Sequence, residues 1–142
     1  MESKTPWYFW LVAALALLWN AGGALDYVMT QTRNEEYMAQ FTQEQLAFFY
    51  GLPSWVVACW ATAVWGGVLG ALLLLLRREV AVQILLVSFA AMALSMFHNF
   101  LLSNGLEVMG DPTSLMFSAA IFVISLALYL FARRMTRVGI LR

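Results

Sequence analysis

The chain has 142 residues, of which 63% are hydrophobic and 11% charged, and its formal net charge at pH 7 is zero. A soluble fold of this size could not bury so much apolar surface, so the composition argues against a soluble domain and predicts a membrane protein whose main partner is the lipid bilayer. The single cysteine, Cys59, excludes an intrachain disulfide. Since the chain has only one histidine and one cysteine, no metal site is expected. No basic tract with interleaved aromatic residues is present, so nucleic acid is not an expected partner.

The first apolar run covers residues 7–28 and follows a short polar lead that carries Lys4. Tryptophan and tyrosine side chains at its start are typical of a membrane interface. A basic lead before an apolar run is also compatible with a cleaved signal peptide. The length of the run, which continues to Leu25, favours a transmembrane helix instead.

The only long hydrophilic stretch, residues 30–52, comes next. Thr42 and Gln45 have the spacing of a capping box, which marks the start of a helix. We therefore predict one or two short amphipathic helices over about residues 34–50, lying on the outer face of the membrane.

A second apolar run covers residues 54–76 without a single charge. At a rise of about 1.5 Å per residue it is long enough to cross a hydrocarbon layer of about 30 Å. Small residues on one face of this helix would let a neighbouring helix approach closely. We expect these helix-packing residues to be Ala63, Gly66, Gly67 and Gly70. The pattern predicts the central packing helix of a bundle.

The third and fourth runs cover residues 80–102 and 114–132. Only a very short connection separates the second run from the third, which makes these two helices antiparallel neighbours. Asp111 can cap the last helix, with Pro112 at its first position. The sequence thus predicts an all-α protein with one integral membrane domain, a four-helix transmembrane bundle.

The positive charges predict the orientation of this bundle. With four crossings, seven of the eight lysines and arginines fall on one side, which is typical of the cytoplasmic face. Only Arg33 falls on the other side. We expect both termini in the cytoplasm and a location in the bacterial inner membrane.

Polar side chains gather in the outer half of the predicted bundle when depth is counted from the rise per residue. The candidate ligand-binding residues are Asn20, Asp26, Tyr27, Trp60, Ser95, His98 and Asn99. Together they suggest a shallow pocket that opens outward and binds a small polar solute, with aromatic surfaces suited to a sugar-like or aromatic ligand.

Each candidate also has a structural explanation. A buried asparagine such as Asn20 is often a hydrogen-bonding strut between helices, and a histidine near the interface is often solvated. Asp26 is the natural partner for His98 if the helices bring them together. Glu107 could pair with Arg33, the one outer cation.

Short motifs that extend over nearly the whole chain point to a family. They are Trp19-Asn20 with Gly23 and Tyr27, Pro53 and Trp55, residues 63–70 (AVWGGVLG) with Arg77-Arg78, and Asn99 with residues 103–110 (SNGLEVMG). In these motifs the chain resembles a group of small four-span bacterial membrane proteins, mostly uncharacterised, whose automatic names call them sugar transporters or sugar-transporter-like. The resemblance implies the four-span fold and the transport of a sugar-like solute. In that family pattern an aromatic residue commonly precedes the asparagine, and His98 departs from it.

Three kinds of function can be weighed at this point. A carrier or binder of a small polar solute would use the outer cluster, and a homodimer could supply the second half that alternating access usually requires. A non-catalytic accessory subunit of a larger membrane complex needs only the small-residue face and the apolar surface. An enzyme is not expected, because one histidine and one cysteine cannot provide two axial haem ligands and no nucleophile–base pair stands at recognisable spacing. No cofactor is expected either.

Overall fold

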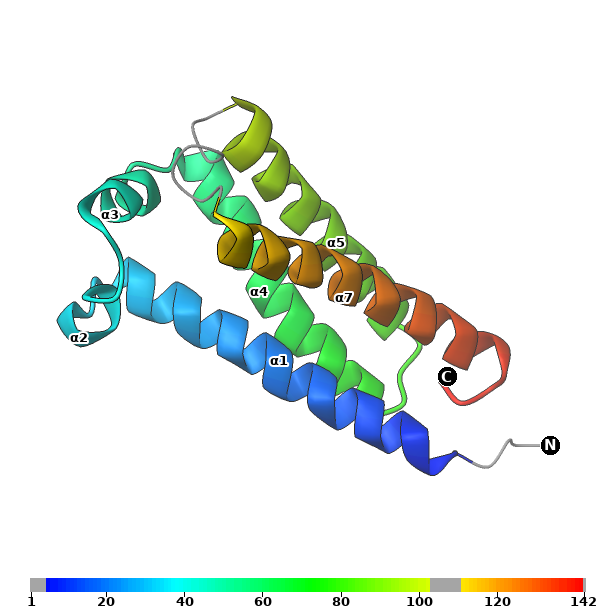
Figure 1. The fold of residues 1–142 in the computed structure, drawn as a ribbon. Coiled ribbons are helices and arrows are strands. Elements are labelled where there is room, and N and C mark those ends of the chain that lie inside the picture. Colours follow the sequence, from blue (N-terminus) through cyan, green and yellow to red (C-terminus); the bar gives the residue numbers. More distant parts are fainter. Residues whose placement is uncertain (1–4, 103–110, 142) are drawn as a thin grey trace.

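A computed structural model describes residues 5–102 and 111–141, and all regular structure in this part of the chain is helical. The long helices are α1 (Trp7–Gln31), α4 (Ser54–Leu75), α5 (Ala81–Phe97) and α7 (Pro112–Arg137) (Figure 1). A π-helical turn, η1 (His98–Leu102), continues α5. Two short helices, α2 (Glu35–Met38) and α3 (Gln43–Tyr50), lie between α1 and α4.

Four helices are long and apolar enough to cross a membrane: Trp7–Gln31, Ser54–Leu75, Ala81–Leu102 and Pro112–Arg137. The predicted all-α fold and its four apolar helices are therefore confirmed. The last helix runs further than the predicted run of residues 114–132, since Arg133, Arg134 and Arg137 lie in its final turns. Arginine is a good helix former, and its charge is favourable near a helix C-terminus.

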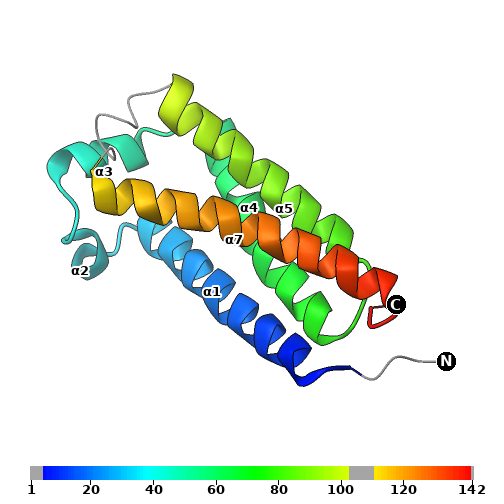
Figure 2. The same cartoon turned by 45° about the vertical axis from the view of Figure 1, so that its right-hand side comes forward.

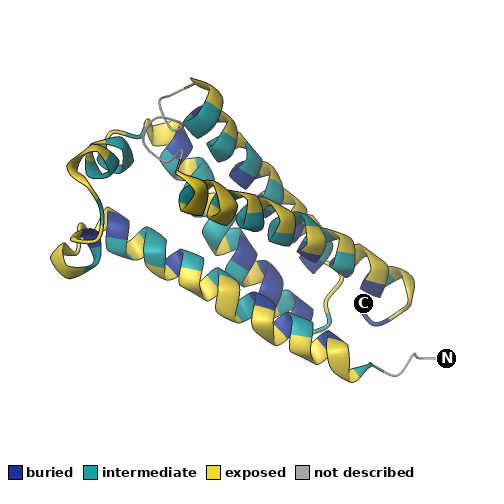
Figure 3. Ribbon diagram, in the orientation of Figure 1, coloured by how far each residue is buried: buried dark blue, intermediate teal, exposed yellow. Residues whose placement is uncertain are grey.

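The four long helices run side by side, so that the start of α1 and the end of α7 lie at one end and the two short helices lie at the other (Figures 1 and 2). We call these the termini end and the α3 end. Large apolar side chains are exposed along all four helices, and the buried positions face the interior (Figure 3). Such a surface suits lipid, because exposed apolar side chains are solvated favourably by acyl chains and unfavourably by water.

Small residues bring α4 into close contact with both α1 and α5. A Cβ added at Gly67 would overlap the Asn20 side chain of α1, and one added at Gly70 would lie 2.7 Å from Leu85 Cγ of α5. On the same side of α4, the Ser88 hydroxyl donates a hydrogen bond of 2.6 Å to the Ala63 carbonyl oxygen. Because lipid supplies no hydrophobic drive for helix association, such close packing and interhelical hydrogen bonding carry the contact.

The buried apolar core lies toward the termini end. Its members come from α1, α4, α5, α7 and the turn after α7, and they are Phe9, Ala13, Ala16, Ala71, Leu74, Ala81, Leu85, Leu128, Ala132, Met135, Ile140 and Leu141. The rings of Phe9 and Phe131 stack with centroids 5.9 Å apart, which joins α1 to α7.

The same hydrogen-bonded turn ends three of the long helices. After α7, Gly139 has a φ of 84°, and the amide of Ile140 donates to the Met135 carbonyl, which is the Schellman pattern. After α4 and α1, the left-handed position is held by Arg77 (φ 58°) and Arg33 (φ 54°). A side chain there costs about 1–2 kcal/mol, and each arginine also makes a favourable contact elsewhere in the fold. Arg77 Nε donates to the Ile140 carbonyl at 3.2 Å, and the Arg33 guanidinium lies 4.2 Å from the centre of the Tyr50 ring.

The substitution Gly67→Ala should lower the free energy of unfolding by about 1–3 kcal/mol, since the new methyl group overlaps Asn20. Unfolding of the purified protein by sodium dodecyl sulfate in mixed micelles measures this. Gly22→Ala is the matched control, because a Cβ at that position of α1 meets no atom within 4 Å. Adding Asn20→Ala to Gly67→Ala should recover part of the loss. Equal stability of the Gly67 and Gly22 variants would contradict the close contact.

Candidate functional site

A cavity of about 170 Å³ lies among α3, α4, α5, η1 and α7. Ten residues line it: Phe48, Phe49, Ala63, Met92, Ser95, Met96, Asn99, Phe100, Ser118 and Ile121. Helix α3 thus lines one side of a space that three long helices border, away from the buried core at the termini end. The cavity is of the size that an apolar cavity needs to hold one benzene-sized molecule, about 150 Å³.

Two of the sequence-predicted candidates, Ser95 and Asn99, line this cavity. The Ser95 hydroxyl oxygen is buried and has no hydrogen-bond partner within the described residues. Most buried hydroxyl groups in proteins are hydrogen-bonded, because leaving one unpaired costs about 1–3 kcal/mol. Because Ser95 lines the cavity, a bound molecule that reached this hydroxyl could satisfy it.

His98 lies next to Asn99, in the π-helical turn at the end of α5. Its side chain is buried, with Nδ1 3.1 Å from Asn99 Oδ1 and the Trp55 ring edge-on at 5.3 Å. In the tautomer with the proton on Nδ1, the imidazole donates to the Asn99 oxygen and orients the amide. His98 thus supports a wall residue of the cavity, and it contacts Asn99 and Trp55 where the sequence suggested Asp26.

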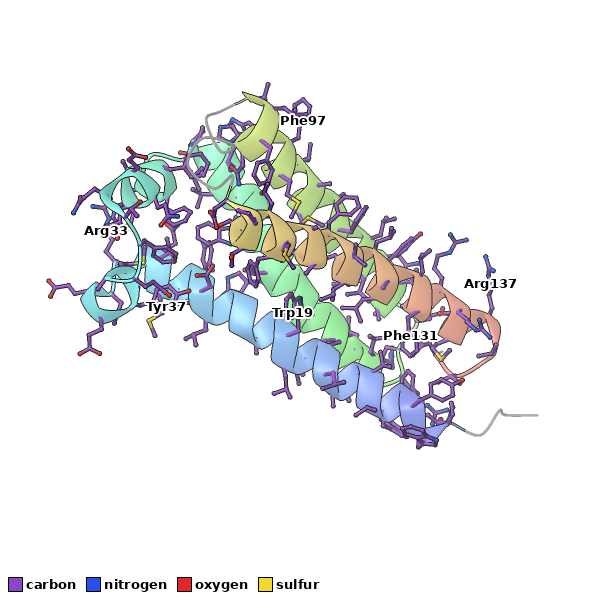
Figure 4. The ribbon with its side chains drawn as sticks, viewed as in Figure 1. Trp19, Arg33, Tyr37, Phe97, Phe131 and Arg137 are labelled. Atoms are coloured by element: carbon purple, nitrogen blue, oxygen red, sulfur yellow. The ribbon has the colours of Figure 1, made fainter. Side chains whose placement is uncertain are left out.

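Asp26 instead pairs with α2. The Tyr37 hydroxyl donates a hydrogen bond to Asp26 Oδ1, where α2 folds against the end of α1 (Figure 4). The Tyr37 ring packs edge-on against Phe41, and Phe41 packs against Phe49 with centroids 5.1 Å apart. Phe49 is part of the cavity wall. A continuous row of contacts therefore connects Asp26 on α1 to the wall of the cavity.

Tyr27 and Trp60 form an aromatic contact between α1 and α4, with ring centroids 4.9 Å apart. The ring centroid of Trp65 lies 6.4 Å from that of Tyr27. The two predicted candidates are thus brought together, as a pair outside the set that lines the cavity. Their rings hold α1 and α4 together.

Asn20 also lies at the α1–α4 contact, where its side chain rests on Gly67. Its amide nitrogen donates a hydrogen bond of 2.8 Å to the Ala16 carbonyl one turn earlier in α1. The side chain therefore packs between helices, as the alternative explanation from the sequence expected, although its hydrogen bond stays within α1. The seven candidates consequently occupy several places, of which only one is the cavity.

Sequence reasoning missed most of the cavity wall. Phe48, Phe49, Met92, Met96, Phe100 and Ile121 are apolar, and an apolar residue of a membrane helix gives no sign of whether it faces lipid, a neighbour or a cavity. Ser118 carried a signal, since polar side chains inside membrane helices are uncommon and usually face the bundle interior. The pairing of Glu107 with Arg33 concerns a residue outside the described ranges, and Arg33 contacts Tyr50.

No group of three or more histidine, cysteine, aspartate or glutamate side chains close enough to hold a metal ion occurs within residues 5–102 and 111–141. Comparison with protein-family models, with curated proteins and with solved structures found no match to the chain. The function must therefore be argued from the chain itself.

The pKa of Tyr37 should lie above the ordinary tyrosine value, because burial disfavours the phenolate and the Asp26 carboxylate accepts the phenol's hydrogen bond and repels the phenolate. Because the pKa is raised, protonated Tyr37 stabilises the fold fully at pH values below the pKa of a tyrosine in the unfolded chain, about 10. This contribution is lost as the pH rises through the pKa of Tyr37 in the folded protein. Subtracting the alkaline absorbance titration at 295 nm of Tyr37→Phe from that of the wild type isolates this residue.

In the Asp26→Asn variant, Tyr37 should titrate at lower pH than in the wild type. Glu35→Gln is the control, since it removes a carboxylate from the same short helix without breaking the hydrogen bond. An unchanged titration of Tyr37 in Asp26→Asn would mean that this pair does not form.

Proposed function

We propose that the chain is a multi-pass protein of a bacterial inner membrane that binds a small solute in the cavity at its α3 end and takes part in the transport of that solute. The observation that carries this proposal is the cavity, one of whose lining residues, Ser95, has a buried hydroxyl with no hydrogen-bond partner within the described residues. A packing defect in a purely structural bundle would be expected to be apolar throughout, because an unpaired polar group destabilises the fold. The resemblance to proteins automatically named as sugar transporters agrees with it.

In this proposal both termini are cytoplasmic and the α3 end faces outward. The charges support this orientation. The arginines after α4 and at the end of α7 lie at the termini end, namely Arg77, Arg78, Arg133, Arg134 and Arg137, while Arg33 lies at the α3 end (Figure 4). Positive charge is concentrated on the cytoplasmic side of inner-membrane proteins.

Labelling of single cysteines tests the orientation. In a Cys59→Ser background, Glu44→Cys in α3 should react with a membrane-impermeant maleimide in intact spheroplasts. Arg137→Cys at the end of α7 should react only after the membrane is permeabilised. Both positions are exposed, so accessibility within the fold does not limit either reaction. The reverse labelling pattern would show that the α3 end is cytoplasmic.

Filling the cavity tests the proposed site. A solute that binds the folded protein alone raises its stability by about 2.7 kcal/mol at one hundred times its dissociation constant. Thermal unfolding of the purified protein should therefore shift upward with at least one member of a panel of small sugars, alcohols and aromatic solutes. The shift should vanish in Ser118→Leu, whose larger side chain occupies the cavity from α7, and should remain in Ser125→Leu, a serine of α7 outside its lining.

A solute that stabilises the wild type and Ser118→Leu equally would bind outside the cavity. No shift with any solute, together with one partner protein co-purifying in stoichiometric amount, would favour the accessory-subunit function. The surface of α7 makes that function the second candidate. Of the 18-residue apolar stretch of α7, 11% is buried, against 22–28% of the corresponding stretches in the other three long helices. A less buried helix leaves more surface for a second copy or a larger complex.

A further inference from the structure

The wall of the cavity narrows the class of solute, on the premise that the proposed binding function holds. Seven of its ten residues carry apolar side chains, and three of these are phenylalanines. Two more are the methionines Met92 and Met96, whose thioethers make favourable contacts with the edges of aromatic rings. Aromatic rings also pack well against one another edge-on or offset. This wall therefore suits a flat apolar ring.

The polar part of the wall is small. Ser95, Asn99 and Ser118 are the lining residues with polar side chains, and Asn99 already has its oxygen next to His98. A free pentose or hexose carries about four or five hydroxyl groups, and each one buried without a partner weakens binding. Backbone groups of the surrounding helices are largely used in their own hydrogen bonds. The cavity can thus satisfy one or two polar groups of a ligand, but not the full set of a sugar.

Ser95, a lining residue on α5 one turn before Asn99, carries a buried hydroxyl that has no hydrogen-bond partner within the described residues. A hydroxyl can both donate and accept, and the Asn99 amide nitrogen is a donor on the next turn of the same helix. A single hydroxyl on the ligand could pair with these two groups at once. Its ring would then lie among the phenylalanine and methionine side chains.

We propose that the cavity selects a small aromatic molecule with a single hydroxyl group, of about the size of phenol, and that the Ser95 hydroxyl is the group that recognises this hydroxyl. The volume of about 170 Å³ accommodates one ring with a small substituent. Ser95 and Asn99 fix the orientation, and α3 covers the ring through Phe48 and Phe49. Specificity then comes from one polar contact in an otherwise apolar space, which is the usual design of a small-molecule site.

Fluorine NMR on the full chain in lipid nanodiscs tests this proposal with three probes. They are 4-fluorophenol, 4-fluorotoluene, which replaces the hydroxyl by a methyl group, and 6-fluoro-6-deoxyglucose. We expect a saturable bound signal for 4-fluorophenol that is absent in Ser118→Leu, which separates the cavity from partition into lipid. The toluene should bind more weakly, and the sugar should give no signal that depends on the cavity.

The Ser95→Ala variant examines the polar contact. Loss of one hydrogen bond should weaken the binding of 4-fluorophenol by about five- to ten-fold and leave 4-fluorotoluene unchanged. Ser125→Ala removes a hydroxyl from α7 outside the cavity and should change neither probe. Circular dichroism of each variant establishes that it is folded.

Three results would overturn the proposal. Equal weakening of both aromatic probes by Ser95→Ala would mean that the serine does not recognise the hydroxyl. A cavity-dependent signal from the fluorosugar alone would assign a sugar-like solute and leave the proposed function intact. The absence of any cavity-dependent signal from the three probes would reject the phenol class, and the thermal panel with Ser118→Leu would then decide separately whether the cavity binds a solute at all.

Discussion

The close approach of α4 to its two neighbours is the constraint on which the rest of the structure depends. Within a bilayer the apolar exterior of each helix is as well solvated by lipid as by protein, so only dense packing and a few polar contacts favour association. Gly67 admits the Asn20 side chain, and Gly70 admits Leu85. With α1 and α5 fixed in this way, the positions of their polar residues along the bundle follow.

The cavity lies where this dense packing ends. Toward the termini end, small residues of α4 face its neighbours and a continuous apolar core fills the interior. Toward the α3 end, bulky rings such as Trp60 and Tyr27 hold α1 and α4 together, and phenylalanines of α3 line the space among α4, α5 and α7. The short hydrophilic segment between the first two long helices is thus part of the site, and the row of contacts from Asp26 through Tyr37 fixes its position.

The sequence was sufficient for the helices, because long uncharged runs, the capping box at Thr42 and the cap at Asp111 are local signals. Both caps form as expected, with Thr42 accepting from the Gln45 amide and Asp111 from that of Ser114. Which polar residues lie together was harder to predict. The depth of a residue along a helix can be counted from the sequence, whereas the rotation of the helix about its axis depends on its neighbours. Asn20 and Ser95 were both predicted to lie in the outer half of the bundle, yet Asn20 packs on Gly67 and Ser95 lines the cavity.

The turn that follows α7 has a practical consequence. Ile140 and Leu141 are each 3% exposed, and the Ile140 carbonyl accepts a hydrogen bond from Arg77 at the junction of α4 and α5. The polypeptide therefore folds back against the bundle after its last helix. An affinity tag or fluorescent reporter fused immediately after Leu141 would disrupt the packing of this turn. A reporter should therefore be attached through a spacer or inserted in the exposed surface of α3.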